Sequence, residues 1–184
     1  MNHFFVFEGL DGVGKTTLLE NLQKDGYEVF VNPTEIHKGI RTKLHNKGKA
    51  SLFYYLSSNA YIIEEQAKNK NNFLIDRYIT SSFIADLYND GKYKYNDFEK
   101  LFKTFSPFFK LPKITFFLTL DEDLRLKRIK DRNDSNNYDQ LDKNYSLLWD
   151  DVIQNYNFSK KVIIDANKSE LELVEEIKFY IQKG

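Results

Sequence analysis

The sequence contains no cysteine, which excludes disulfide bonds, thiolate chemistry and zinc sites built from cysteine. This absence fits a reducing compartment, and we expect a cytoplasmic protein. No apolar stretch approaches the ~20 residues of a membrane-spanning helix, and Met1-Asn2-His3 lacks the basic start of a signal peptide. Basic and acidic residues balance at 27 each, so no overall basic field would attract a nucleic-acid polymer. Any anion site must therefore be local.

The chain is long enough and apolar enough for one domain with a substantial core. It has 184 residues, of which 41% are hydrophobic, and it contains 16 phenylalanines and 12 tyrosines. We find no internal repeat and no linker rich in proline, glycine or serine. We expect a single domain over residues 1–184 with an aromatic-rich interior.

Five continuous apolar runs predict strands that are buried on both faces of a sheet. They cover residues 3–8, 27–32, 72–76, 113–120 and 161–165. Between some of them, apolar residues recur at helical spacing, as over 98–105 and 145–156, and again over 174–181 after the last strand. We expect these stripes to face the core. Alternation of strands and helices favours an α/β fold with a five-stranded parallel sheet and helices on both faces.

Residues 9–16 fit the phosphate-binding pattern G-x-x-x-x-G-K-[ST], between the first predicted strand and a predicted helix. The backbone N–H groups of such a loop can wrap polyphosphate oxygens. Lys15 is expected to reach the β- and γ-phosphates, and the Thr16 hydroxyl to hold Mg²⁺. The expected ATP-binding residues are Gly9, Leu10, Asp11, Gly12, Val13, Gly14, Lys15, Thr16 and Thr17.

Three classes of protein use this loop, and two fit poorly. A GTPase needs a D-x-x-G switch, which we find in no suitable place, and an N-K-x-D segment. Residues 167–170 read Asn-Lys-Ser-Glu, with glutamate where aspartate is needed. A motor ATPase of ordinary size would need a longer chain. A small-molecule kinase fits the length.

The order of motifs resembles thymidylate kinase, within the nucleoside monophosphate kinase family. The segment 7–17 is similar to that family's phosphate loop, and Asp76-Arg77-Tyr78 with Ser81-Ser82 is similar to its D-R-Y-x-x-S-S segment. Residues 120–132 look like its strand, helix and arginine-bearing lid, and 162–166 resemble its closing strand. The resemblance implies the three-layer sandwich of P-loop NTPases, a homodimer, and transfer of the ATP γ-phosphate to dTMP, giving dTDP.

Phosphoryl transfer needs positioning and cations more than covalent chemistry. The attacking oxygen of a monophosphate is already anionic, so no general base is needed. The resemblance implies that Arg77 grips the acceptor phosphate through its planar fork. It also implies that Asp76 lies near the metal through water and orients the acceptor, and that Ser82 contacts the substrate. Mg²⁺ would then be held by Thr16 and Asp76.

Arg128 and Arg132 lie four residues apart on a predicted helix and therefore share a face. The polar stretch that follows could close over the phosphates, so we expect a lid at about 128–140. An arginine delivered in this way stabilises charge in the transition state. A solvated basic helix is the alternative, especially for Arg128.

The acceptor side departs from the family pattern. The second strand ends in Asn32 where the family has glutamate, while Arg41 still matches as a second clamp on the acceptor phosphate. Tyr55 stands where a phenylalanine stacks on the base, and Asn59 where an arginine reads thymine. Asp86 replaces a frequent glutamine. Asn59 could pair with thymine or with other bases, since it offers a donor and an acceptor.

Two other functions stay open. A kinase of a different nucleotide would keep the same loop with an altered base pocket. A deoxynucleoside kinase would need a carboxylate base near the second strand, which only Glu35 could supply. A binding module that lost turnover is a third reading, against which the intact Lys15, Thr16, Asp76 and Arg77 argue.

Overall fold

The computed structural model describes residues 3–44, 47–66, 71–131 and 142–183. Its centre is a five-stranded parallel sheet in the order β2-β3-β1-β4-β5, which confirms the predicted fold class. The strands are β1 (Phe4–Glu8), β2 (Glu28–Val31), β3 (Phe73–Asp76), β4 (Ile114–Thr119) and β5 (Lys160–Asp165). Each strand lies within a residue or two of its predicted range.

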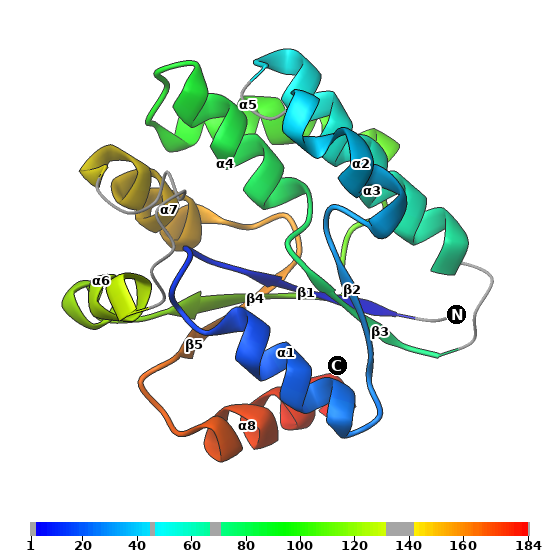
Figure 1. Cartoon of the computed structure of the whole chain (residues 1–184), viewed down its shortest axis with the longest axis vertical. Helices are drawn as coiled ribbons and strands as arrows, with labels where there is room; N and C mark the ends of the chain where they lie inside the picture. The colour runs from blue at the N-terminus through cyan, green and yellow to red at the C-terminus, as the bar shows by residue number, and fades with distance from the viewer. Residues whose placement is uncertain (1–2, 45–46, 67–70, 132–141, 184) are drawn as a thin grey trace.

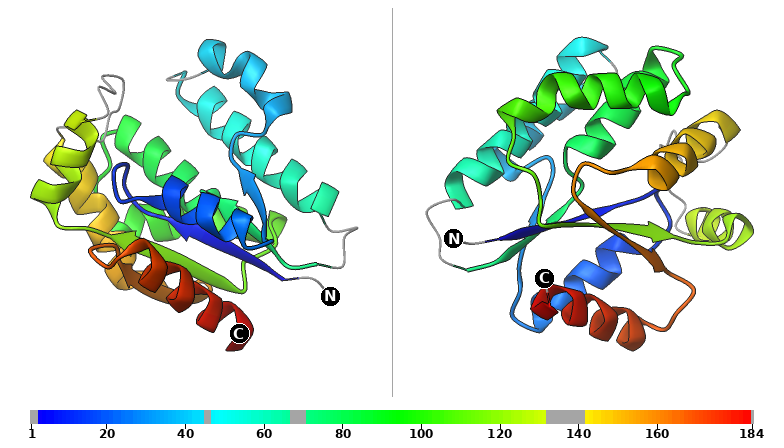
Figure 2. Two further views of the ribbon diagram at one scale, coloured as in Figure 1. Left: turned by 60° about the horizontal axis from the view of Figure 1, so that its bottom comes forward. Right: turned by 180° about the vertical axis from the view of Figure 1, so that it is seen from behind.

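Helices cover both faces of the sheet (Figures 1 and 2). On one face lie α1 (Lys15–Lys24) and α8 (Glu170–Lys183), and on the other lie α3 (Lys49–Gln66), α4 (Ile79–Asn89), α5 (Tyr95–Phe105) and α7 (Lys143–Asn155). The remaining helices are α2 (Glu35–Leu44), packed on α3, the short 3₁₀ turn η1 (Ser106–Phe108), and α6 (Glu122–Asp131), beyond the end of β4. In the described part of the chain, none of these helices has the length and apolarity to span a bilayer.

The aromatic stripes face the core, as predicted. Phe98 and Phe102 of α5 are buried, and Phe102 stacks on Phe158 at 3.9 Å between ring centroids. On α7, Leu148 and Trp149 are fully buried. These side chains fix the helical layer rather than offer a surface for stacking bases.

The prediction that the strands are buried on both faces is confirmed for the three inner strands and wrong for the two outer ones. Every residue of β1 and β3 is buried, whereas Val31 of β2 is 52% exposed and Ile163 of β5 is 50% exposed. The reason is position, because β2 and β5 form the edges of the sheet and have a neighbour on only one side. An apolar run alone does not reveal which strand becomes an edge.

The register of the central strands brings two distant motifs together. Phe7 of β1 pairs with Asp76 of β3, so the loop after β1 and the segment after β3 leave the sheet side by side. The carboxyl edge of a parallel sheet is where such folds bind ligands. The fold therefore places the phosphate loop against Asp76 and Arg77.

Candidate active site

The phosphate loop is shaped by glycines that no other residue could replace without strain. Gly9 has φ +139° and Gly12 has φ +87°, both left-handed or beyond, where side chains are disfavoured. A Cβ on Gly9 would lie 2.6 Å from the carbonyl oxygen of Leu118, and one on Gly12 would lie 2.8 Å from Cγ1 of Ile129. The loop is thus packed tightly between the end of β4 and α6.

Lys15 opens α1 and is buried within the loop. Its Nζ atom donates to the carbonyl oxygens of Gly9 at 2.9 Å and Leu10 at 2.8 Å. Thr16 follows on the first turn of α1 and is exposed. The ammonium is therefore held against the loop backbone, on the residue that begins α1, and the N-terminus of a helix favours bound anions.

Arg77 lies against this loop. Its Nη2 atom pairs with Oδ1 of Asp11, and its Nη1 atom donates to Oγ of Ser81 at 3.1 Å. Its backbone N–H donates to the carbonyl oxygen of Phe7 at 3.0 Å. Arg77, which follows β3, therefore lies directly beside the phosphate loop.

Asp76 ends β3 and is 9% exposed. Its Oδ1 atom is buried and has no hydrogen-bond partner among the described residues. A buried carboxylate oxygen without a donor is costly, so it calls for a cation or water. The described residues hold no group of three or more histidine, aspartate or glutamate side chains that could bind a metal. Mg²⁺ suits such a sparse site, since it uses one or two carboxylates together with waters and substrate phosphates.

Asn32, which follows β2, and Asn59 of α3 add two more buried oxygens. The Oδ1 atoms of both lack a partner among the described residues. Asn59 is fully buried on α3, and its Nδ2 atom lies 3.4 Å from Oγ of Ser82 on α4. Both side chains therefore retain the capacity to accept a hydrogen bond from a ligand.

The other residues predicted on this side are placed less directly. The half-buried Tyr55 lies beside Tyr54, with 4.9 Å between ring centroids, and Arg41 is exposed on α2. Asp86 is buried, and its Oδ2 atom forms an ion pair with Nζ of Lys49 at 2.6 Å. Asp86 is thus already neutralised by a neighbour that the sequence prediction did not name.

Glu35, the carboxylate on which a deoxynucleoside kinase would depend, points to solvent. Its side chain is 84% exposed and pairs with Lys38 one turn along α2. A general base must lie within hydrogen-bond reach of a bound hydroxyl in a site that limits water. The geometry of Glu35 does not favour that role.

Arg125 is a site residue that the sequence prediction missed. It is 1% exposed, and its Nη1 atom donates to the carbonyl oxygen of Asp11 at 3.0 Å. Its Nε and Nη2 atoms bind both carboxylate oxygens of Glu122, at 2.7 and 2.8 Å, and hold the pKa of Glu122 below its usual value. The available signal was spacing, because Arg125 lies three residues before Arg128 and shares its helical face.

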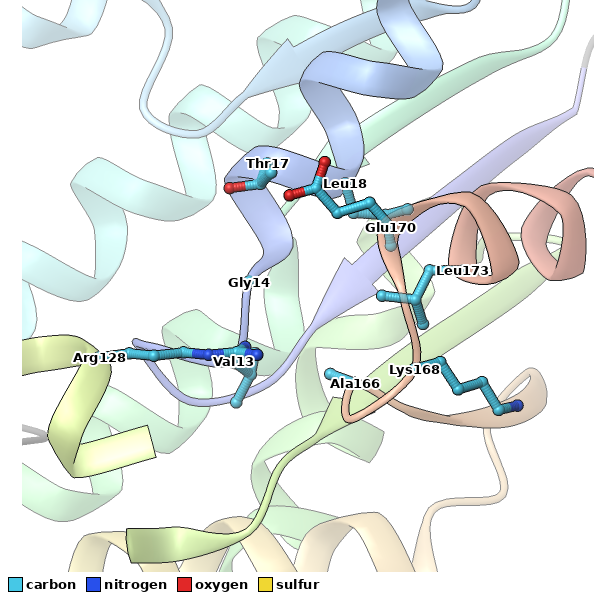
Figure 3. Close-up of a pocket in the computed structure, with 9 residues that line it drawn as sticks. All are labelled: Val13, Gly14, Thr17, Leu18, Arg128, Ala166, Lys168, Glu170 and Leu173. Carbon is cyan, nitrogen blue, oxygen red and sulfur yellow. The ribbon is translucent and has the colours of Figure 1, made fainter. Parts of the chain in front are cut away.

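Arg128 reaches the other side of the loop. Its Nη1 atom lies 3.5 Å from where a Cβ of Gly14 would be. It borders a pocket of about 240 Å³ between the loop, α1 and the start of α8, and Figure 3 shows it extending toward Val13 and Gly14. The pocket is lined by Val13, Gly14, Thr17, Leu18, Arg128, Ala166, Lys168, Glu170 and Leu173. The part of the predicted lid that begins at Arg132 lies outside the described residues.

Comparison with known proteins agrees with this arrangement. The sequence model of the family described as thymidylate kinase matches residues 7–177. A thymidylate kinase of Campylobacter jejuni subsp. doylei is 31% identical, over 97% of this chain and all of that protein. A probable thymidylate kinase of Methanocaldococcus jannaschii is 30% identical, over 94% of this chain and 92% of that protein.

Solved structures show the same fold at lower identity. A deoxyadenosine kinase from M. mycoides with bound dATP superposes with a TM-score of 0.70 at 21% identity, covering 97% of this chain and 99% of that one. A thymidylate kinase from Candida albicans superposes with a TM-score of 0.68 at 18% identity, covering 99% of this chain and 92% of that one. The family resemblance noted in the sequence is confirmed: the chain belongs to the thymidylate kinase family and is an ATP-dependent nucleoside monophosphate kinase, a phosphotransferase.

Proposed function

We propose that this protein transfers the γ-phosphate of ATP to dTMP, giving dTDP. The observation that carries the proposal is the contact of Arg77 with Asp11 of the phosphate loop. It places a cation for the acceptor phosphate beside the loop that would hold the donor phosphates. Two anions can meet there only if positive groups on both sides offset their repulsion.

On the donor side, residues 9–17 would bind the ATP phosphates. Lys15 would exchange its bonds to the carbonyls of Gly9 and Leu10 for phosphate oxygens, which are stronger acceptors because they carry charge. The pocket beside Gly14 would take the adenine, with Arg128 at its border. Arg132 remains a proposed second arginine at the transferred phosphoryl group.

Thr16 and Asp76 would hold Mg²⁺, which when bound neutralises charge on the β- and γ-phosphate oxygens. The buried, unpartnered Oδ1 of Asp76 supports this assignment. The Asp76 carboxylate would contact Mg²⁺ through a water molecule rather than directly. The triphosphate would then have room in the short loop between β1 and α1.

On the acceptor side, Arg77 would release Asp11 and bind the monophosphate in a bidentate manner. Asp11 would then be available to the sugar, while Arg41 and Ser82 would contact the acceptor from α2 and α4. No side chain needs to remove a proton, since the attacking phosphate oxygen is already ionised.

Base recognition would depend on Asn59 and Tyr55. The N3–H of thymine would satisfy the unpartnered Oδ1 of Asn59, and Tyr55 would stack on the ring. Asp86, held by Lys49, would border the base. A site that depends on one hydrogen bond to the base rejects analogues lacking the donor.

Turnover of ATP with Mg²⁺ against all common nucleoside monophosphates and nucleosides tests the proposal. We expect dTMP to give the highest kcat/KM. Preference for another monophosphate would replace the base assignment alone. Turnover of nucleosides only would favour a deoxynucleoside kinase, and binding without turnover would favour a module that lost catalysis.

We further propose a cytoplasmic homodimer of single-domain subunits. Ile36 and Ile40 of α2 and Phe53 of α3 are 68%, 47% and 56% exposed and support a helical interface. Analytical ultracentrifugation tests this, and a monomer at micromolar concentration would contradict it.

A further inference from the structure

Glu8 is a fully buried carboxylate that the proposed reaction does not use. It is the last residue of β1, immediately before the phosphate loop, and is 0% exposed. Burial raises the pKa of its carboxyl above the ordinary value, an effect that the Ser81 hydroxyl and the Arg77 guanidinium oppose. A charge at this place is therefore held at a cost in stability.

The contacts of Glu8 are those of a helix cap supplied from another strand. Its Oε1 atom accepts from the backbone N–H groups of Tyr78 at 3.0 Å and Ser81 at 3.3 Å. Tyr78 is the N-cap of α4 and makes no side-chain cap bond. In a capping box, two side chains of the helix itself satisfy these two N–H groups. Glu8 satisfies both, and its charge faces the positive end of the α4 dipole.

The turn that Glu8 holds contains Arg77. Arg77 has φ +65° and is the one non-glycine residue with a positive φ in the described part of the chain. Such a conformation costs free energy and persists only where the surroundings fix it. The backbone N–H of Arg77 is fixed by Phe7 of β1, and the next residue, Tyr78, is fixed by Glu8.

Glu8 also reaches the guanidinium through one hydroxyl. The Ser81 hydroxyl donates to Oε2 of Glu8, so its oxygen turns its lone pairs to Nη1 of Arg77 at 3.1 Å. The order of the chain of contacts is Glu8, Ser81, Arg77. A glutamine could accept from the two backbone N–H groups, but its amide would compete with Arg77 for the Ser81 oxygen.

We propose that Glu8 is a positioning residue, which fixes the left-handed turn at Arg77 and aims its guanidinium at the acceptor phosphate through Ser81. This inference rests on the proposed role of Arg77 in binding that phosphate. It gives the glutamate before the loop a function on the acceptor side, although the loop itself serves the donor.

Glu8→Gln tests the inference, since it keeps the cap and removes the charge. We expect the KM for dTMP to rise about tenfold, the effect of weakening one charge-assisted hydrogen bond, with the KM for ATP within about twofold. The melting temperature at neutral pH should stay equal or increase, because the cost of the buried charge is removed. An unchanged KM for dTMP, or equal rises for both substrates, would overturn the inference.

Ser81→Ala and Thr80→Val form a matched pair in the same turn of α4. Both remove a buried hydroxyl, but of the two, only the Ser81 hydroxyl donates to Glu8 among the hydrogen bonds of the described residues. Only Ser81→Ala should raise the KM for dTMP. Equal effects of the two variants would assign the change to a loosened turn and overturn the relay.

A readout independent of turnover separates this inference from the proposed function. The side-chain NMR signal of Arg77 Nε, assigned with Arg77→Lys, should shift in Glu8→Gln without any substrate. An unshifted signal overturns the inference whatever the acceptor is. A shifted signal in a protein that does not phosphorylate dTMP supports the positioning and removes only the substrate assignment.

Discussion

The donor half and the acceptor half of the proposed site differ in how their polar groups are satisfied. On the donor side, Lys15 and Arg125 bind carbonyl oxygens of the phosphate loop itself. On the acceptor side, one oxygen of each of Asn32, Asn59 and Asp76 is buried without a partner among the described residues. The donor half therefore satisfies its polar groups with hydrogen bonds inside the loop, whereas the acceptor half has buried oxygens that can still accept a hydrogen bond.

This difference follows from what each half must recognise. A triphosphate always presents the same oxygens, so a short loop with fixed glycines and one lysine is sufficient. A base and sugar vary among substrates, and in the proposed site their recognition would draw on β2, α3, β3 and α4. Changes such as Asn59 and Asp86 can therefore alter the acceptor without disturbing the loop.

The largest effect should come from Lys15→Ala. We expect turnover to fall about 10³-fold or more, since the main protein cation on the donor phosphates is lost. Thermal melting should change by only a few degrees, because the loop remains held by β4 and α6. Lys24→Ala, at the exposed far end of α1, is the control and should behave like the wild type. Retained turnover would remove Lys15 from the donor half.

Arg77→Ala should separate the two halves most clearly. We expect the affinity for the acceptor monophosphate to fall about 100-fold, with ATP affected only a few-fold, because the charge-assisted fork faces the acceptor. Calorimetric titration of each nucleotide measures both. Arg77→Lys keeps the charge without the fork and should lie between. Equal losses of affinity for the two nucleotides would contradict the assignment of Arg77 to the acceptor half.

Arg125→Met should act on the donor half through the loop. We expect about tenfold weaker ATP binding and about 1–2 kcal/mol lower stability, because the Asp11 carbonyl loses its donor. Glu122 is 52% exposed, so water would replace the arginine at its carboxylate and limit the loss. Glu122→Gln keeps the bond to Asp11 and should have the smaller effect on ATP. If both variants bind ATP with the same affinity, the contact of Arg125 with the Asp11 carbonyl does not contribute to ATP binding.

Asp90→Asn should have the smallest effect of these substitutions, and that effect should be on stability. Asp90 lies outside the acceptor half. Lys49 holds the pKa of Asp90 below its ordinary 3.8, so the pair contributes stability above that pH and loses it as the pH falls through the folded pKa. Since Lys49 is 55% exposed, we expect less than about 1 kcal/mol at pH 7.

Urea unfolding at neutral pH and near pH 3 measures the Asp90 contribution. The difference between Asp90→Asn and the wild type should shrink at the acid end, and the kcat/KM for dTMP should not change. A stability difference that grows in acid would contradict the sign of the pKa shift.

The sequence predicted the parts of this site that are local. The glycine pattern, Lys15 and the strand before them form one continuous segment, so a single stretch of chain carries both the signal and the structure. Asp76 and Arg77 were recognised through the resemblance of residues 76–82 to the family's D-R-Y-x-x-S-S segment, which is also local in the chain. Arg125 was missed because its spacing from Arg128 does not reveal that it donates to the backbone carbonyl of Asp11, more than 100 residues away.

What the sequence by itself determined is the alternation of strands and helices, the identity of the loop and the family. Tertiary structure decided which strands became edges, that Lys49 neutralises Asp86, and that Glu8 caps a helix 70 residues away. The physical reason is that hydrophobic periodicity and glycine conformations act over a few residues. Pairing of buried polar groups depends on strand order and register, which only the assembled sheet supplies.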